Sequence, residues 1–237
     1  MGEHEEEDEE VDMTENGAPG GGVAGGPPPP DTSDMLAVHG ALRGALGAGK
    51  ARVHGVAPED AERRELICSY YEDVLWFLRV HHEGEEELVF PKVRERAPAA
   101  VAVVDAMEEQ HSDVVELLTA SEAALAAWRA GDTGAQARLA DDLQALNEAL
   151  EPHLAQEETQ LLPWCAQTLT IEEWGALPGH ALSQYQGDKM WLVIGLIMEQ
   201  RTPADQQVML EHMPPPVVEM WNAMGHRSFH EMAAKVG

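Results

Sequence analysis

The chain has 237 residues and a formal charge of -28 at pH 7, from 43 acidic against 15 basic residues. This length suits one sizeable helical domain with an appendage better than two full domains. A surface this acidic repels phosphate backbones and anionic lipid headgroups. The charge therefore argues against nucleic acid and membrane surfaces as partners, and it makes cations the natural ligands.

The first 33 residues combine a Glu/Asp block, a glycine-rich run and four consecutive prolines. Such a composition cannot bury enough apolar surface to offset the entropy lost on ordering, so residues 1 to 33 are predicted to form a disordered acidic tail. The N-terminus is acidic where a secretory signal would be basic and then apolar. No apolar run approaches the roughly 20 residues needed to cross a bilayer. We therefore expect a cytoplasmic protein.

Four stretches carry apolar residues at helical spacing, and they predict an all-α, up-down four-helix bundle. The predicted helices are residues 34 to 48, 58 to 91, 98 to 130 and 134 to 164. Pro91 is expected to kink or end the second helix, and Gly131 to cap the third. The bundle domain is predicted to span residues 34 to 165.

The last segment, residues 171 to 237, is rich in Met and Trp and is predicted to form additional short helices. Thr202 followed by Pro203 is typical of a helix start. We expect this C-terminal helical extension to pack against the bundle or to mediate contact with a protein partner or a second copy. His226 and His230 stand four residues apart within it and are interpreted as part of a solvated helix face.

A shift of 72 residues superposes the two halves of the bundle sequence. Each half then has one histidine in the apolar stripe of its first helix and a His-x-x-x-Glu pair on its second. Because residues four apart lie on the same face of a helix, all these side chains are predicted to face one interior. The residues concerned are His39, His81 and Glu85 in the first half and His111, His153 and Glu157 in the second.

Four imidazole nitrogens and two carboxylates in one interior suit two divalent first-row metal ions, with iron favoured over manganese and zinc. Cys68 and Cys165 stand alone in apolar patterns, which argues against an iron–sulfur cluster, a Cys-rich zinc site or a disulfide framework. The alternative is a metal-free His–Glu network. Burying six such groups unpaired would cost several kcal/mol per group, which favours the metal.

Helix 58 to 91 offers two registers, because His82 and Glu86 form a second His-x-x-x-Glu pair. The repeat favours His81 and Glu85, which match the corresponding pair in the second half. Since adjacent residues lie about 100° apart around a helix, only one of the two histidines is expected to point squarely inward. His82 and Glu86 remain the alternative candidates.

The segments HHEGEEELVFP and HLAQEETQLLP, together with His39 and the EEQH segment that ends at His111, resemble the hemerythrin-like or HHE cation-binding proteins. The resemblance covers about residues 34 to 165. It implies a four-helix bundle around a non-haem di-iron centre, with the six residues of the repeat as iron ligands. It also implies that Glu85 and Glu157 bridge the two irons.

One departure from the oxygen-carrying members of that family concerns the third helix, where they have a His-x-x-x-His pair and five histidines in all. Here Met107 and Val115 stand four residues from His111. The resemblance then implies an iron with an exchangeable position, and hence binding or reduction of dioxygen, hydrogen peroxide or nitric oxide rather than oxygen transport. A peroxidase- or catalase-like or nitric-oxide-handling enzyme, an iron or oxygen sensor without turnover, and a zinc-containing structural bundle all stay open.

Overall fold

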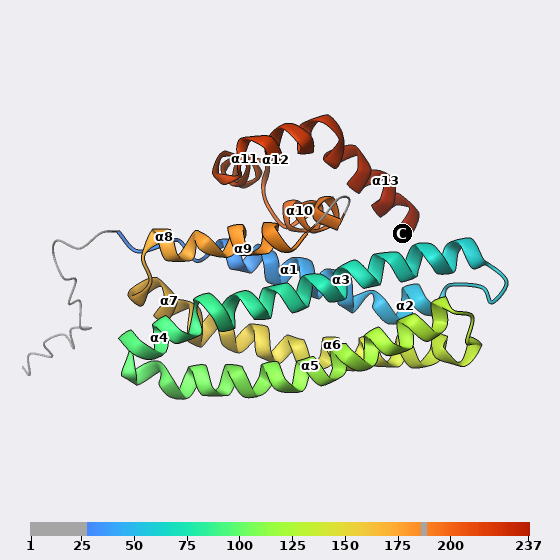
Figure 1. Cartoon of the computed structure of the whole chain (residues 1–237), viewed down its shortest axis with the longest axis horizontal. Coiled ribbons are helices and arrows are strands. Elements are labelled where there is room, and N and C mark those ends of the chain that lie inside the picture. Colours follow the sequence, from blue (N-terminus) through green and yellow to red (C-terminus); the bar gives the residue numbers. More distant parts are fainter. Residues whose placement is uncertain (1–27, 186–188) are drawn as a thin grey trace, which may run out of the picture.

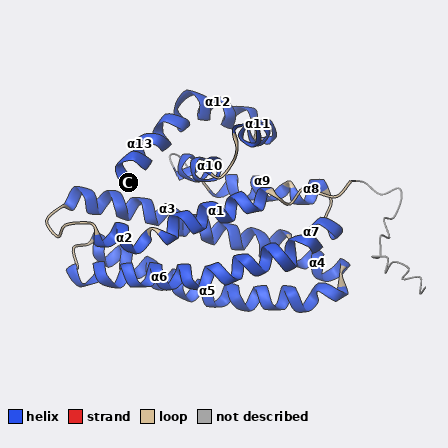
Figure 2. Cartoon of the chain, turned by 180° about the vertical axis from the view of Figure 1, so that it is seen from behind, coloured by secondary structure: helices blue, strands red, loops and turns tan. Residues whose placement is uncertain are grey.

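A computed structural model describes residues 28–185 and 189–237, and within these ranges the chain contains helices and no strand (Figure 2). The predicted all-α fold is confirmed. The predicted tail lies outside the described residues as far as residue 27. Within the described part of the chain, no helix combines the length and apolar character that a membrane span requires.

Four long helices lie side by side and form the bundle (Figure 1). They are α1 (Asp34–Gly47), α3 (Ala61–Leu88), α5 (Val101–Arg129) and α6 (Thr133–Gln156). Helix α1 contacts α3 and α6, and α5 contacts the same two helices, so the four close into a ring. The short helix α2 (Gly49–His54) packs mainly on α6. The interior between the long helices is filled by buried leucine, valine and aromatic side chains.

Local signals fix where the helices begin and end. The Asp60 side chain accepts a hydrogen bond from the Arg63 backbone at the start of α3, as an N-cap residue does. Helix α3 ends before Pro91, which lies in the first turn of α4 (Phe90–Arg96). A short 3-10 turn, Pro98–Ala100, leads into α5. Gly131 has a positive φ of 98° after α5, where a residue with a Cβ would be strained.

The last helix of the bundle is not uniform, although residues 134 to 164 predict a plain helix. After α6 the backbone widens into a π-helical segment, Glu157–Leu161, and then continues as α7 (Leu162–Thr168). Pro163 has no N–H to donate to the carbonyl four residues earlier, so the α-helical pattern cannot continue unbroken here. Single π turns are frequent at functional sites, and this one begins at Glu157.

The C-terminal extension consists of short helices that lie along one side of the bundle (Figure 1). They are α8 (Ile171–Trp174), α9 (Ala176–Gln184), α10 (Lys189–Glu199), α11 (Pro203–His212), α12 (Pro215–Met220) and α13 (His226–Val236), with a π-helical turn at Trp221–Gly225. Helix α9 packs on α3, α10 packs on α1 and α3, and α13 covers α10. The expected packing of the extension against the bundle is therefore what the structure has.

Close packing between α10 and α13 depends on two glycines. A Cβ on Gly195 would lie 2.2 Å from the Phe229 ring, and a Cβ on Gly225 would lie 2.7 Å from the Trp191 ring. Aromatic rings thus take the space that side chains would fill at these positions. The aromatic side chains buried between α10 and α13 belong to the same hydrophobic core as the bundle interior.

Candidate metal centre

Seven buried histidine and glutamate side chains meet inside the bundle. No member of this cluster is more than 8% exposed. Helix α3 contributes three of them, α1, α5 and α6 contribute one each, and the π-helical segment contributes the last. The residues are His39, His81, His82, Glu85, His111, His153 and Glu157.

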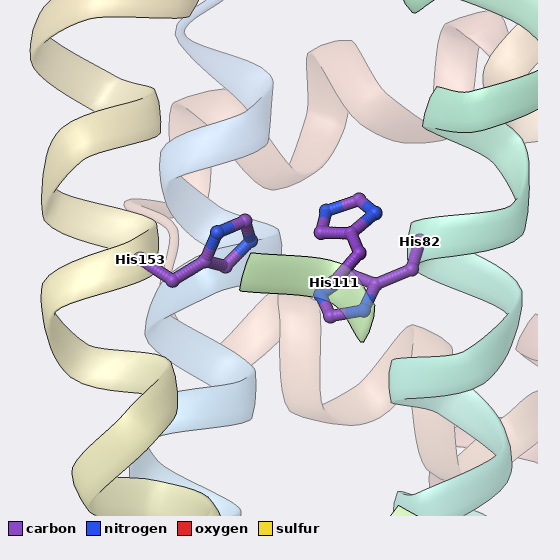
Figure 3. Close-up of side chains that lie close together, drawn as sticks. All are labelled: His82, His111 and His153. Atoms are coloured by element: carbon purple, nitrogen blue, oxygen red, sulfur yellow. The ribbon is translucent and has the colours of Figure 1, made fainter. Parts of the chain in front are cut away.

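The cluster divides into two groups. The three-histidine group consists of His82, His111 and His153, and the mixed group consists of His39, His81, Glu85 and Glu157. Within each group, one ligand atom of every residue lies within 4.8 Å of those of the others. Figure 3 shows the imidazoles of the three-histidine group converging from separate helices. The rings of His82 and His111 are stacked, with centroids 3.9 Å apart and 11° between their planes.

Glu85 lies between the two groups. Its Oε1 is 3.7 Å from His81 Nε2 in the mixed group, and its Oε2 is 3.5 Å from His111 Nε2 in the three-histidine group. The second carboxylate, Glu157, has its Oε2 3.2 Å from His39 Nε2. One carboxylate therefore faces both groups with different oxygens, which is the arrangement that a bridging ligand requires.

An outer layer of polar groups orients three of the rings. Glutamate or glutamine oxygens lie within hydrogen-bond distance of each Nδ1 atom. The pairs are His39 with Glu158 at 2.9 Å, His111 with Glu86 at 2.9 Å and His153 with Gln110 at 3.0 Å. Arg43 also donates to the Glu158 oxygen and so holds that carboxylate in place. Because carboxylate and amide oxygens accept, each Nδ1 donates. In the neutral ring the Nε2 atom then keeps a lone pair directed at the interior.

The inner atoms of the cluster are left without partners. Among the described residues, the Nε2 atoms of all five histidines, both oxygens of Glu85 and Oε2 of Glu157 are buried and form no hydrogen bond. The His–Glu approaches of 3.2 to 3.7 Å thus do not amount to a hydrogen-bonded network. Buried donors and acceptors normally have partners, since leaving one unpaired costs about 1–3 kcal/mol. Metal ions coordinated by these atoms would satisfy all of them at once.

The electrostatics of the histidines favour metal binding. Burial lowers the pKa of His111 and of His153 to about 4. Burial lowers the pKa of His81 and of His82 well below the usual value, and the neighbouring histidines add to that effect. These imidazoles are therefore neutral at pH 7, which is the form that binds a metal ion.

The pKa values of the two buried carboxylates, Glu85 and Glu157, shift in opposite directions. Burial raises the pKa of Glu85 well above its usual value, and the nearby Glu157 raises it further. Burial also acts to raise the pKa of Glu157, but attraction to His39 outweighs it and the pKa is lowered. For His39, burial lowers the pKa, while Glu157 and Glu158 outweigh burial and raise it. The cluster without metal thus holds one ionised carboxylate and one that a cation would ionise.

All six residues that the repeat selects lie in the cluster, and so does the alternative candidate His82. Glu86 does not, because its side chain is 48% exposed and reaches His111 from outside. The expectation that only one of His81 and His82 points inward is wrong, since both are buried. The core-facing stripe of a helix is more than 100° wide, so two adjacent residues can stand at its two edges.

The count of four inward histidines is also wrong, because His82 makes a fifth. The third helix has one buried histidine, as predicted, but His82 of α3 stacks on it and fills the three-histidine group. The adjacent histidines of the HHEGEEELVFP segment were the available signal. The repeat hid this signal, because His82 aligns with Leu154 in the second half, where an apolar residue stands instead of a histidine.

A four-helix bundle with imidazoles and carboxylates directed at one interior defines a class of metal-binding helical proteins. The chain belongs to the hemerythrin HHE cation binding domain family, whose model matches residues 31–165, more than half of its length. The resemblance drawn from the motifs is thereby confirmed.

Relatives of this chain include proteins described as uncharacterized from Mycobacterium bovis and from two strains of Mycobacterium tuberculosis. Each is 29% identical over 147 residues, which is 59% of this chain and 55% of the relative. The chain thus spans about half the length of the curated relatives it matches. No solved structure matches it.

Proposed function

We propose that the protein is a non-haem di-iron protein that binds or reduces a small oxidant, namely dioxygen, hydrogen peroxide or nitric oxide. One observation carries this proposal: among the described residues, five buried imidazole Nε2 atoms, both oxygens of Glu85 and Oε2 of Glu157 converge without hydrogen-bond partners. Such a donor set, with nitrogen and carboxylate but no thiolate, suits iron, and manganese or zinc less well.

The proposed ligands are the seven residues of the cluster, with Glu85 shared between the metals. Sharing gives four donors to each ion, because Glu85 adds to three imidazoles in one group and to two imidazoles and Glu157 in the other. A six-coordinate ion then keeps positions for an outside ligand. The open positions therefore do not depend on a missing imidazole on the third helix, because His82 supplies a third imidazole to its group.

When bound, the two irons would supply the electrons that an oxidant accepts. The residues of this chain have two tasks around them. Glu158, Glu86 and Gln110 fix the ring orientations of His39, His111 and His153 through Nδ1. Buried apolar side chains on both sides of the cluster, with Leu42 and Leu78 on one side and Phe90 and Leu161 on the other, exclude bulk water.

The test is oxidant consumption by the iron-loaded full-length chain. Hydrogen peroxide, dioxygen and nitric oxide are offered separately, and the variant His153→Ala is compared with His226→Ala, which changes an exposed histidine outside the cluster. The proposal expects consumption of at least one oxidant by the native chain and by His226→Ala, with a loss of at least about tenfold in His153→Ala. Zinc or no metal in a chain purified with iron would overturn the di-iron proposal and favour the structural bundle.

A second candidate, an iron or oxygen sensor without turnover, is favoured by how the extension contacts α1. A Cβ on Gly40, the residue after His39, would lie 2.8 Å from the Gln200 side chain. At the start of the same helix, Trp174 donates to the Asp34 carboxylate and Arg201 donates to the Asp34 carbonyl. A shift of α1 on metal binding would therefore displace the residues of the extension that contact it.

Limited proteolysis of residues 171 to 237, with and without iron, separates the two candidates. A sensor is expected to change its cleavage rate with iron and to consume none of the three oxidants. Oxidant consumption with an unchanged cleavage pattern would contradict the sensor.

A further inference from the structure

The surface of the bundle is hollowed directly outside the three-histidine group. A depression of about 420 Å³ lies between α3 and α5 and is lined by Glu86, Glu108, His111, Ser112 and Val115. Four of these residues belong to α5, and Glu86 belongs to α3. We call this depression the acidic mouth, because its two charged side chains are carboxylates.

His111 connects the acidic mouth to the buried cluster. The side chain is only 1% exposed, yet it forms part of the lining. Its Nδ1 faces Glu86 Oε1 at 2.9 Å, on the side of the mouth, while its Nε2 faces Glu85 Oε2 at 3.5 Å, on the side of the cluster. A single imidazole ring thus separates solvent from the inner ligand atoms at this point. The Nε2 atom has no hydrogen-bond partner within the described part of the chain.

The charge around the acidic mouth is negative. Glu108 pairs with Arg94 at 3.1 Å, and Arg94 also pairs with Asp105 at 2.5 Å. Among the residues that the structure describes, no arginine or lysine lies within ion-pair distance of Glu86, whose side chain is 48% exposed. Three carboxylates against one guanidinium leave a net local charge of about -2, which concentrates cations at the opening and repels anions.

From this geometry we propose that the acidic mouth is the entry route for the divalent metal ions of the centre, with Glu86 as the residue that first holds the cation and passes it to His111. The inference rests on the proposed function, because it presupposes that the cluster binds metal. Transfer involves no covalent or redox step. The cation exchanges water for the Glu86 carboxylate. The half-exposed Glu86 side chain then swings away and releases Nδ1, so that the His111 ring can turn and offer its unprotonated Nε2 to the cation.

The experiment measures the rate at which Co²⁺, a spectroscopically visible divalent cation, associates with the metal-free full-length chain. The variant Glu86→Gln with Glu108→Gln removes both charges that line the mouth. The matched control is Glu87→Gln with Glu109→Gln, which makes the same change of net charge at neighbouring positions of the same two helices, outside the lining. Glutamine at position 86 can still accept from His111 through its amide oxygen.

The expected result is a roughly three- to tenfold lower association rate constant for the mouth variant at low ionic strength, with a smaller difference at high salt. The control pair should bind Co²⁺ at close to the native rate. Glu108 is not a candidate ligand, so Glu108→Gln alone should slow Co²⁺ association only by removing a negative charge. Arg94→Gln removes a positive charge and should accelerate association. Equal slowing in the control pair would overturn the proposal, because the effect would then be one of overall charge.

A steric variant gives an independent test. Val115→Trp places an indole in the acidic mouth from a side chain that is 41% exposed, and Val208→Trp makes the same change at a 49% exposed valine of α11. Slow Co²⁺ association in Val115→Trp alone supports entry through the mouth, and unchanged rates in both variants contradict it. If the native chain binds no metal at equilibrium, the proposed function fails. If it binds metal and all the rates agree, only the entry route fails.

Discussion

The two halves of the buried cluster use different chemistry for the same task. The three-histidine group offers three neutral imidazoles, and the shared Glu85 faces the inner nitrogen of one of them, whereas the mixed group combines two imidazoles with two carboxylates. Carboxylates stabilise a higher metal charge, while imidazoles also suit the lower one. The proposed metal centre would therefore be asymmetric, with mainly neutral ligands at one position and more anionic ligands at the other, and with Glu85 shared between them.

The largest effect is expected from removing the shared carboxylate. Glu85→Ala takes one donor from each group, so metal content should fall from about two ions per chain to fewer than one. Glu87→Ala, two positions along the helix with a 65% exposed side chain, is the control. Because Glu85 is buried with a raised pKa, the metal-free variant should not be less stable than the metal-free native chain. Unchanged metal content would contradict the bridging role.

Removing one imidazole from one group should cost about half as much bound metal as removing Glu85. His82→Ala leaves the mixed group intact, so we expect one of two metal ions to be lost while the other is retained. Elemental analysis of the purified variant measures this, with His226→Ala as the control. Retention of both ions would remove His82 from the ligand set, and loss of both would mean that the two groups do not bind independently.

Acid should destabilise the metal-free protein. The pKa of His111 and of His153 is lowered to about 4 in the folded chain, against about 6.5 in the unfolded one. The unfolded state therefore takes up protons first, and stability present above pH 6.5 is lost as the pH falls toward 4. The loss is about 3 kcal/mol per histidine at the acid end. Urea unfolding of the chelated protein across this range measures it, and a flat profile would contradict the burial of neutral imidazoles.

The smallest effect is expected in the outer layer. Gln110→Ala removes the acceptor for His153 Nδ1, and loss of such a partner typically weakens metal binding by about 10- to 100-fold. The three-histidine group should lose affinity while the mixed group keeps it, as measured by competition with a chelator. The control is Gln144→Ala, whose side chain donates to Glu148 at an exposed position outside the cluster. Equal weakening of both groups would show that the two positions are not separable.

Much of the fold was predictable because it follows local rules. Three signals can be read directly from the sequence and act over a single turn: the helical spacing of apolar residues, Pro91 just beyond the end of α3, and Gly131 after α5. The π-helical segment at Glu157 was not, because a proline signals an interruption but not the form that the backbone adopts there.

Most members of the buried cluster were predicted from the sequence, and the one that the repeat did not select, the alternative candidate His82, is instructive. The 72-residue repeat located six of the seven buried residues, because each keeps its place in both halves. His82 breaks the repeat. Only packing shows that its ring stacks on His111 and completes a group of three histidines. The outer-layer partners Glu158 and Gln110 lie 119 and 43 residues from the histidines they orient, and no local pattern marks them.

The most direct test of the central claim is the anomalous diffraction of iron in crystals of the iron-loaded chain. We predict two peaks roughly 3.5 to 4 Å apart, one among His82, His111 and His153 and the other among His39, His81 and Glu157, with Glu85 between them. A single peak, or iron bound only outside the buried cluster, would contradict a two-metal centre built from these two groups.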